Sequence, residues 1–375
     1  MQYEIIRNDQ QLARCCHNAR QAPRIALDSE FVRNRTFYPQ LGLIQLYDGV
    51  QISLIDPLGI QAWQPLRDLF QDPQVDKVLH ASGEDIETFQ HYLGVVPHPL
   101  WDTQILAAFG GGPLSSSYSS LVASHLQVSL DKQQQRTDWL ARPLQQQQLH
   151  YAAADVYYLL PVAEQLLEQL TQGPWLVAAQ EECQWLVQQR TLAIDPQQLY
   201  QQMIPSQGLA PRSLACLKKL AAWRFSEAVA RNRALNFVVQ AHDLWQIAQA
   251  LPNSLQALRQ LALPQPVLHR YAQTLLTLVA ETEQLPVASL PTPPPCLILQ
   301  GHYKAAVTAI KQLINTVAAQ HQLTPALLAS KRHIDQLLIW HWYVEQRDQR
   351  GYPLLLQGWR AALLGPSLMA LLAAY

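Results

Sequence analysis

Residues 25–31, with the sequence IALDSEF, most constrain the fold, because an apolar run ends there in two acids. The first three residues predict a buried β-strand. Side chains two positions apart on a strand point to the same face, so Asp28 and Glu30 would lie side by side at its end. Adjacent carboxylates out of water repel each other unless a positive charge lies between them. The segment therefore predicts a divalent cation site, although a solvated strand edge is the alternative for an isolated D-x-E triplet.

Two further segments place acidic residues where they suit the same site. Residues 78–89 run from an apolar strand through small residues into a helix, which puts Asp85 in the first helical turn. The alternative for this residue is a carboxylate that serves only the helix dipole. Farther along, the sequence YAAAD puts Tyr151 and Asp155 on one face of a helix, one turn apart.

The chain thus contains three motifs in a fixed order: D-x-E, a strand-to-helix Asp and Y-x-x-x-D. In this respect it resembles the DEDD superfamily of 3′-5′ exonucleases, in its tyrosine-bearing subclass. Longer segments resemble bacterial ribonuclease D over nearly the whole chain: residues 28–46, 56–58, 102–107 and 136–144, the last with the sequence RTDWLARPL. The resemblance implies a hydrolase, a metal-dependent 3′-5′ exoribonuclease that releases nucleoside 5′-monophosphates. It also implies substrates, namely the 3′ ends of transfer RNA precursors and of other structured RNAs.

The resemblance implies a role for each motif residue in a two-metal-ion mechanism. Asp28 would bridge the two ions, and Glu30 and Asp155 would complete the shell of the first. Asp85 would hold the second ion, and Tyr151 would orient the attacking water. Oxygen ligands without any Cys or His favour Mg²⁺ or Mn²⁺ over zinc. A phenol with a pKa near 10 is a poor base at neutral pH, so orientation is the expected role of the tyrosine.

The succession of patterns predicts an α/β domain with a mixed sheet covered by helices. Strands are expected at 3–7, 25–31, 41–47, 52–55 and 75–79, and helices at 10–20, 63–70 and 85–93. Asp48-Gly49 predicts a hairpin between the third and fourth strands. This arrangement agrees with the ribonuclease H-like fold that the resemblance implies.

Two linkers predict three domains. A Gln- and Pro-containing segment ends an exonuclease domain at 1–195, and the proline-rich residues 290–295 follow a helical domain at 210–289. The sequence from 214 to 261 resembles an HRDC domain, a small helical module that binds nucleic acid. The tail, 296–375, repeats this plan weakly and predicts a second HRDC-like domain, with an unrelated helical bundle as the alternative.

Charge is divided between the two halves of the chain. Residues 1–195 hold 12 Lys and Arg against 21 Asp and Glu, a net charge of −9, whereas residues 196–375 hold 15 against 7, a net charge of +8. Such asymmetry suggests interaction with nucleic acid or membrane, although it also lets the halves attract each other. Contacts to RNA are expected from residues after the acidic strand and from a basic helix, with ordinary solvated surface as the alternative. They are Arg33, Arg35, Tyr38, Arg212, Lys218, Lys219, Arg224 and Arg231.

Composition excludes other classes. Five cysteines form neither an even disulfide framework nor a C-x-x-C metal pair, which indicates reduced thiols in the cytoplasm. The N-terminus lacks the apolar core of a signal peptide, and no apolar run reaches membrane-spanning length.

A monomer that acts on RNA is expected. Two alternatives stay open: a DNA exonuclease, because the choice of sugar depends on 2′-hydroxyl contacts, and an RNA-binding scaffold with vestigial carboxylates.

Overall fold

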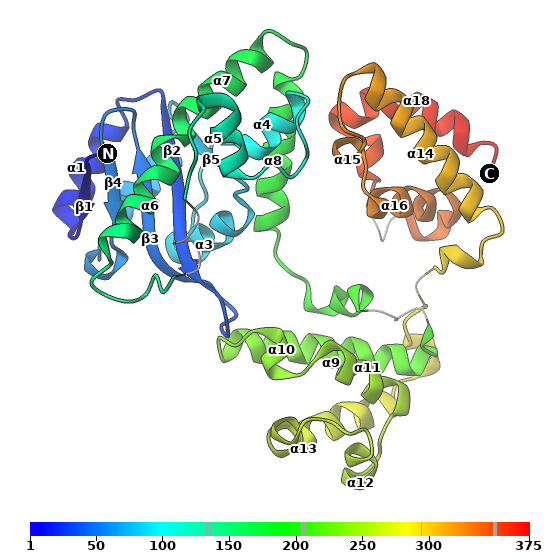
Figure 1. Ribbon diagram of the computed structural model, residues 1–375. Helices are drawn as coiled ribbons and strands as arrows, with labels where there is room; N and C mark the ends of the chain where they lie inside the picture. The colour runs from blue at the N-terminus through cyan, green and yellow to red at the C-terminus, as the bar shows by residue number, and fades with distance from the viewer. Residues whose placement is uncertain (132–133, 135–136, 204–207, 294, 348–350) are drawn as a thin grey trace. The chain divides into compact units, whose positions relative to one another are not determined.

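The computed structural model describes residues 1–131, 134, 137–203, 208–293, 295–347 and 351–375. They form two compact units (Figure 1). The first unit consists of Met1–Val32, Pro39–Leu192 and Gln300–Tyr375, and the second of Arg33–Tyr38 and Ala193–Leu299. None of the helices among these residues has the length and apolar character that crossing a membrane requires.

The first unit is built on a six-stranded sheet with the order β1-β4-β3-β2-β5-β6 (Figure 1). The strands are β1 (Tyr3–Ile6), β2 (Arg24–Val32), β3 (Gln40–Tyr47), β4 (Ile52–Ile55), β5 (Asp76–Leu79) and β6 (Leu100–Asp102). β3 runs antiparallel to both of its neighbours, and the other neighbouring strands are parallel. The predicted mixed sheet and the hairpin at Asp48-Gly49 are therefore confirmed.

The pairing of β2 explains why its end can form a site. Its first apolar residues are fully buried, and on one side they pair with β5 only as far as Ala26. On the other side, pairing with β3 continues to Val32, with Asp28 opposite Gln45. The acidic end of β2 therefore has a strand partner on one side only, and the other side is open to the chain that follows β5.

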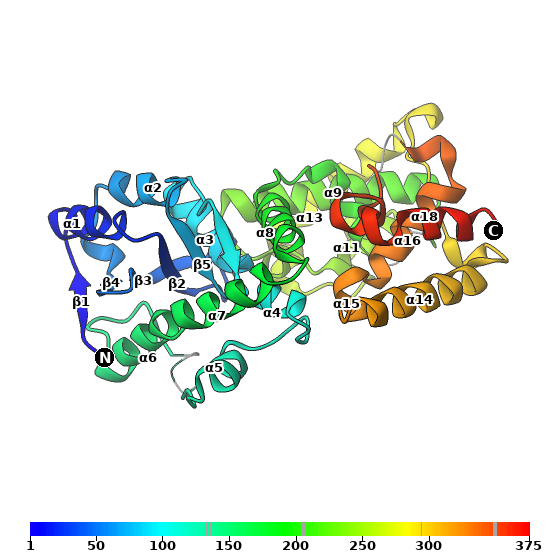
Figure 2. The same ribbon diagram turned by 90° about the horizontal axis from the view of Figure 1, so that it is seen from above.

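Helices cover both faces of the sheet. Figure 2 shows α1, α2 and α3 on one face, and α6 and α7 on the other, where α6 packs against β2, β3 and β4. Their bounds are α1 (Asp9–Ala19), α2 (Gln64–Phe70), α3 (Gly83–Leu93), α4 (Thr103–Phe109), α5 (Tyr118–Leu126), α6 (Gln146–Tyr157), α7 (Leu159–Thr171) and α8 (Leu176–Thr191). α1 begins one residue before the predicted start, and the side chain of Asn8 caps it by accepting a hydrogen bond from the backbone N–H of Gln11 at 2.9 Å.

The C-terminal helices of the first unit pack on α8 through a buried ion pair. These helices are α14 (Tyr303–Gln320), α15 (Pro325–Leu328), α16 (Lys331–Trp342) and α18 (Gly358–Leu372). Arg360 of α18 donates two hydrogen bonds to Glu182 of α8, at 2.5 and 2.9 Å. The indole Nε1 of Trp359 donates to the same carboxylate at 3.1 Å. Both charged side chains are buried, so the pair holds the C-terminal helices to α8 out of contact with water.

The second unit is helical and includes a short piece of the sheet domain's chain. A 3₁₀-helix (Pro196–Gln202) precedes α9 (Pro211–Ala230), α10 (Leu235–Val238), α11 (Ala241–Ala250), α12 (Leu255–Arg259) and α13 (Gln265–Glu283). Residues 33–38, which connect β2 to β3, belong to this unit. There the ring of Phe37 packs edge-on against Phe225, 5.4 Å between centroids, and the carbonyl of Arg35 accepts from the N–H of Ala234 at 2.9 Å.

The two helical domains share one plan. A long helix, a four-residue helix and a third helix follow one another as α9, α10 and α11, and again as α14, α15 and α16. The predicted α/β domain followed by two helical domains is thus confirmed. β6 was not predicted, because three residues are too few to show a period of two. Part of the predicted first linker, residues 204–207, lies outside the described residues.

Candidate active site

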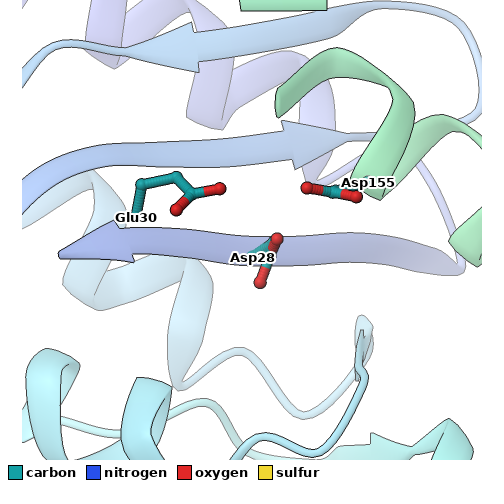
Figure 3. A group of neighbouring side chains, drawn as sticks. All are labelled: Asp28, Glu30 and Asp155. Carbon is teal, nitrogen blue, oxygen red and sulfur yellow. The ribbon is translucent and has the colours of Figure 1, made fainter. Parts of the chain in front are cut away.

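Three carboxyl groups converge above the centre of the sheet. Asp28 and Glu30 come from β2 and Asp155 comes from α6, which packs against this strand (Figure 3). One ligand oxygen from each lies within 4.8 Å of those of the other two. Within the part of the chain that the structure describes, this is the one group of three or more acidic, His or Cys side chains with that spacing.

The electrostatics of this cluster fit a bound cation. Burial, followed by repulsion from neighbouring acids, raises the pKa of Glu30 to about 9 and that of Asp28 well above its ordinary value. Burial also raises the pKa of Asp155 to about 8. Three neighbouring carboxyl groups that repel one another, two of them half-buried and one buried, are stabilised as anions by a divalent ion with oxygen ligands. The donor set is therefore suited to Mg²⁺ or Mn²⁺.

Tyr151 lies one turn before Asp155 on α6, on the same face, as predicted. Its hydroxyl lies beside the Asp155 carboxyl group, and each of the two groups shifts the pKa of the other. Burial and then the charges of Asp155 and Glu30 raise the pKa of this phenol far above its usual value. The hydroxyl therefore stays protonated at neutral pH and acts as a hydrogen-bond donor.

Asp85 lies in the first turn of α3, as predicted, but outside the group of three. Its carboxyl group is buried, and the hydroxyl of Ser29 donates a hydrogen bond to it. Burial raises the pKa of Asp85 to about 6, and the Ser29 hydroxyl opposes this shift. After burial, the charge of Asp85 is the largest contribution to the raised pKa of Asp28. Asp85 is thus held close to the cluster by Ser29, which lies between Asp28 and Glu30 on β2.

The turn that leads into α3 depends on Asp102, at the end of β6. Its buried carboxylate accepts hydrogen bonds from the backbone N–H groups of Ala81 and Ser82 at 3.1 and 2.8 Å. Ala81 has a φ of 51°, a strained conformation for a residue with a side chain, which these bonds help to maintain. Asp102 therefore fixes the turn that carries Asp85. No local sequence pattern indicates this role beyond the resemblance of residues 102–107.

A loop held by Arg142 supports Tyr151 from the other side. The guanidinium of Arg142 binds both carboxylate oxygens of Asp56, at 2.8 and 2.9 Å, and donates to the carbonyl of Gly42 at 2.7 Å. This loop buries Trp139, whose ring lies 6.1 Å from that of Tyr151. A Cβ at Gly42 would lie 2.7 Å from the carbonyl oxygen of Trp139, so the close approach of the loop requires glycine.

A second phenol lies beside the cluster. The hydroxyl of Tyr118, the first residue of α5, donates to the carbonyl of Ala154 at 3.0 Å. Burial and then the charges of Asp155 and Asp28 raise its pKa well above the usual value. Tyr118 thus anchors the turn of α6 that carries Asp155. Sequence reasoning missed it because it follows a Gly- and Ser-rich segment without a recognisable pattern.

The residues predicted to contact RNA lie in the second unit, in different environments. Arg33 and Arg35 are exposed, and Tyr38 and Lys218 are partly exposed. Lys219 pairs with Glu281 at 2.7 Å, and Arg231 pairs with Glu227.

Two of the predicted contacts are used by the fold itself. Arg212 donates to the carbonyls of Thr282 and Glu283 at the end of α13, both at 2.7 Å. Arg224 is a correction to the predicted set, because it is only 8% exposed and its guanidinium donates to the carbonyl of Val239 at 3.2 Å. Its long apolar stem is buried against the core of the helical domain, which leaves the charge no open surface for RNA.

Comparison with known proteins gives matches over the whole chain. Residues 3–171 match the family described as 3'-5' exonuclease, residues 213–279 the HRDC domain, and residues 301–368 the ribonuclease D C-terminal HRDC domain. The chain is 48% identical to ribonuclease D of Musicola paradisiaca and 45% identical to that of Escherichia coli K12, each over 100% of both chains. The crystal structure of E. coli RNase D, described as an exoribonuclease involved in structured RNA processing, superposes with a TM-score of 0.97 over 100% of both chains.

Proposed function

Because the chain belongs to the ribonuclease D family and is therefore a 3′-5′ exoribonuclease, a hydrolase, we propose that it trims the 3′ ends of transfer RNA precursors and other structured RNAs. The convergence of Asp28, Glu30 and Asp155 carries this proposal, because three oxygen ligands this close together would hold the cation that phosphodiester hydrolysis needs. The description of the E. coli relative as an enzyme of structured RNA processing supports the choice of substrate.

The proposed cofactors are two divalent ions, Mg²⁺ or Mn²⁺. Asp28, Glu30 and Asp155 would hold one of them, and Asp28 and Asp85 the other. Bound there, the ions would lower the pKa of the attacking water and neutralise the charge that develops on the phosphate and on the departing 3′ oxygen. The raised pKa values of the carboxyl groups support this assignment, since no positive side chain among the described residues pairs with the cluster.

The protein groups would position the reacting atoms. Because the Tyr151 hydroxyl stays protonated, we assign it the orientation of the attacking water rather than the removal of its proton. Trp139 and the Arg142 loop would hold this tyrosine in place. Attack at the terminal phosphodiester would release one nucleoside 5′-monophosphate at a time.

The second unit would supply contacts to the RNA backbone. Within the proposed set, seven of the eight side chains are candidates: Arg33, Arg35, Tyr38, Arg212, Lys218, Lys219 and Arg231. The match of residues 213–279 to the HRDC domain supports this role. We further propose that the protein acts as a monomer in the cytoplasm, which is consistent with its five free cysteines.

The first experiment is the digestion of a 5′-labelled single-stranded RNA in EDTA, Mg²⁺ or Mn²⁺, with products resolved at one-nucleotide spacing. We expect a metal-dependent ladder that shortens from the 3′ end, and no ladder from Asp28→Asn. Intact RNA in every metal, despite normal RNA binding, would favour the scaffold alternative. A DNA oligomer of the same sequence serves as the comparison, and faster cleavage of DNA would contradict the choice of RNA.

A further inference from the structure

A cavity of about 510 Å³ lies in the second unit, between the start of α13 and the chain around α10. We call it the α13 groove and define it by Arg233, Phe237, Gln265, His269, Arg270 and Tyr271. It belongs to the first helical domain alone and lies outside the acidic cluster. No acidic residue is among the described side chains that line it.

The two arginines of the α13 groove have charges that the fold leaves available. Among the described residues, neither Arg233 nor Arg270 forms an ion pair, whereas Lys219 and Arg231 of the same domain pair with Glu281 and Glu227. The N-terminus of the 19-residue helix α13 faces the groove without a side-chain cap, so its backbone dipole adds positive potential. This combination attracts an anion.

An aromatic ring lies beside these charges. Phe237 is 46% exposed, although phenylalanine is usually buried, and the guanidinium of Arg35 lies 5.9 Å from the centre of its ring. Tyr271 lines the same groove, and its buried hydroxyl has no hydrogen-bond partner among the described residues. An exposed ring beside cations is the arrangement on which proteins stack the bases of single-stranded nucleic acid.

We propose that the α13 groove binds a single-stranded segment of the RNA substrate, with Arg233 and Arg270 on a phosphodiester and the adjoining base stacked on Phe237. The inference rests on the proposed function, because it takes RNA as the substrate. An acidic peptide would satisfy the arginines equally well but would leave the exposed ring without a planar partner. Stacking and phosphate contacts carry little base information, so binding is expected to tolerate changes in sequence.

The test is the equilibrium binding of a fluorescent single-stranded RNA of about 12 nucleotides to the full-length protein in EDTA, where cleavage is suppressed. In the variant R233A/R270A we expect affinity to fall at least tenfold. The plot of log K against log salt concentration should flatten by roughly 0.7, the value for the one single-strand phosphate contact that the two arginines share. The variant Phe237→Leu keeps an apolar side chain without the ring, and should lose roughly tenfold in affinity with little change in slope.

The control variant R259A/K304A removes two charges outside the groove and should bind RNA like the wild type. Thermal unfolding checks that each variant folds, and R233Q/R270Q replaces the alanine variant if that one is unstable. Wild-type affinity and slope in the groove variants would overturn the inference. Equal competition by a polyglutamate peptide and by unlabelled RNA would also overturn it, in favour of a protein partner.

A small chromogenic substrate separates this inference from the proposed function. Hydrolysis of the p-nitrophenyl ester of thymidine 5′-monophosphate with Mn²⁺ reports on the acidic cluster, and R233A/R270A should retain it. If the wild type cleaves neither this ester nor RNA, the proposed function fails while the binding measurement still decides the groove.

Discussion

At the scale of single residues, the acidic cluster opposes its own ionisation in the absence of a cation. Glu30 and Asp155 have pKa values of about 9 and 8 in the folded protein, far above the values near 4 of an unfolded chain. The folded protein therefore binds more protons than the unfolded chain between about pH 4 and pH 9. Since the free energy of unfolding falls with rising pH wherever the folded state binds more protons, the cluster destabilises the metal-free protein progressively across this window.

The variant Glu30→Gln tests whether the cluster makes the free energy of unfolding fall with rising pH. In EDTA, the melting temperature of the wild type should fall more steeply between pH 5 and pH 9 than that of Glu30→Gln, because the variant lacks one of the mutually repelling groups. At pH 8 we expect the variant to melt roughly 2 to 4 °C higher, which corresponds to about 1 kcal/mol. Glu168→Gln removes an exposed acid of α7 and is the control. Parallel curves for all three proteins would contradict the assignment.

Ser29 gives a second prediction for single residues. Its hydroxyl donates to Asp85, which the proposal assigns to a metal ion, so Ser29→Ala should weaken the binding of Mn²⁺ by roughly 10-fold or more. Isothermal titration calorimetry of the ion alone, without RNA, measures this directly. Ser29→Thr keeps the hydroxyl and should recover most of the affinity. If the alanine variant binds Mn²⁺ like the wild type, Ser29 has no part in holding the ion.

At the scale of elements, two long-range ion pairs hold the site and its surroundings. The Arg142–Asp56 pair fixes the loop that packs Trp139 against Tyr151, and the Glu182–Arg360 pair fixes α18 on α8. Each pair includes at least one buried or half-buried partner, and each Arg also binds backbone carbonyls. Breaking either pair should therefore cost more than breaking an exposed one.

For the loop, we predict an effect on turnover. Arg142→Lys keeps the charge but cannot bind both oxygens of Asp56, so Tyr151 should lose its fixed orientation and kcat should fall by about 10-fold. Mn²⁺ affinity should change less than twofold, because none of the acids in the cluster touches Arg142. Arg67→Lys, on α2, is the matched control, since among the described residues the side chain of Arg67 donates only to the carbonyl of Leu93. A parallel loss of ion affinity would show that the loop supports the acids as well.

For the helix pair, we predict an effect on stability. Arg360→Ala leaves the buried carboxylate of Glu182 without a partner, and should cost roughly 3 to 5 kcal/mol in the unfolding of the first unit. The double variant E182M/R360M replaces the pair by apolar groups and should recover more than half of this loss. Arg14→Ala breaks the exposed pair with Glu4 and should cost under about 1 kcal/mol. Denaturant titration of the four proteins measures these differences, and equal costs for the two single variants would refute the prediction.

The elements also show what the sequence could predict. β2, α3 and α6 follow from local patterns, since the strand has an apolar run and the helices have acids at the correct spacing. The Ser29–Asp85, Asp56–Arg142 and Glu182–Arg360 contacts join residues 56, 86 and 178 positions apart, and no local pattern connects them. Arg224 was misplaced for the same reason: a run of charges does not show which helix face the core covers.

At the scale of the whole molecule, the two units carry different chemistry. Asp28, Glu30, Asp85 and Asp155 all belong to the first unit, and the basic helix α9 and the α13 groove to the second. The predicted division of charge between the halves follows this arrangement only in part. Residues 300–375, with 7 Lys and Arg against 3 Asp and Glu, belong to the first unit, and Arg33 and Arg35 belong to the second. Ligands that bind one unit should therefore stabilise that unit first.

Scanning calorimetry can test this independence. We expect two transitions for the metal-free protein. Mg²⁺ should raise the melting temperature of only the transition that belongs to the first unit. The free energy of unfolding of that unit should increase by about 2.7 kcal/mol at an ion concentration 100 times the Kd. In Asp28→Asn, neither transition should respond to the ion. If Mg²⁺ raises both transitions of the wild type equally, the units unfold as one cooperative body.

The distance in sequence between Glu182 and Arg360 also matters during synthesis. A ribosome that adds about 5 to 20 residues per second needs on the order of 10 to 40 s to cover the 178 residues between them. The acids of β2, α3 and α6 have all been translated before this interval begins. A nascent chain can therefore assemble its acidic cluster while Glu182 still lacks its partner, and during that time the unfinished face of α8 is open to chaperones and proteases.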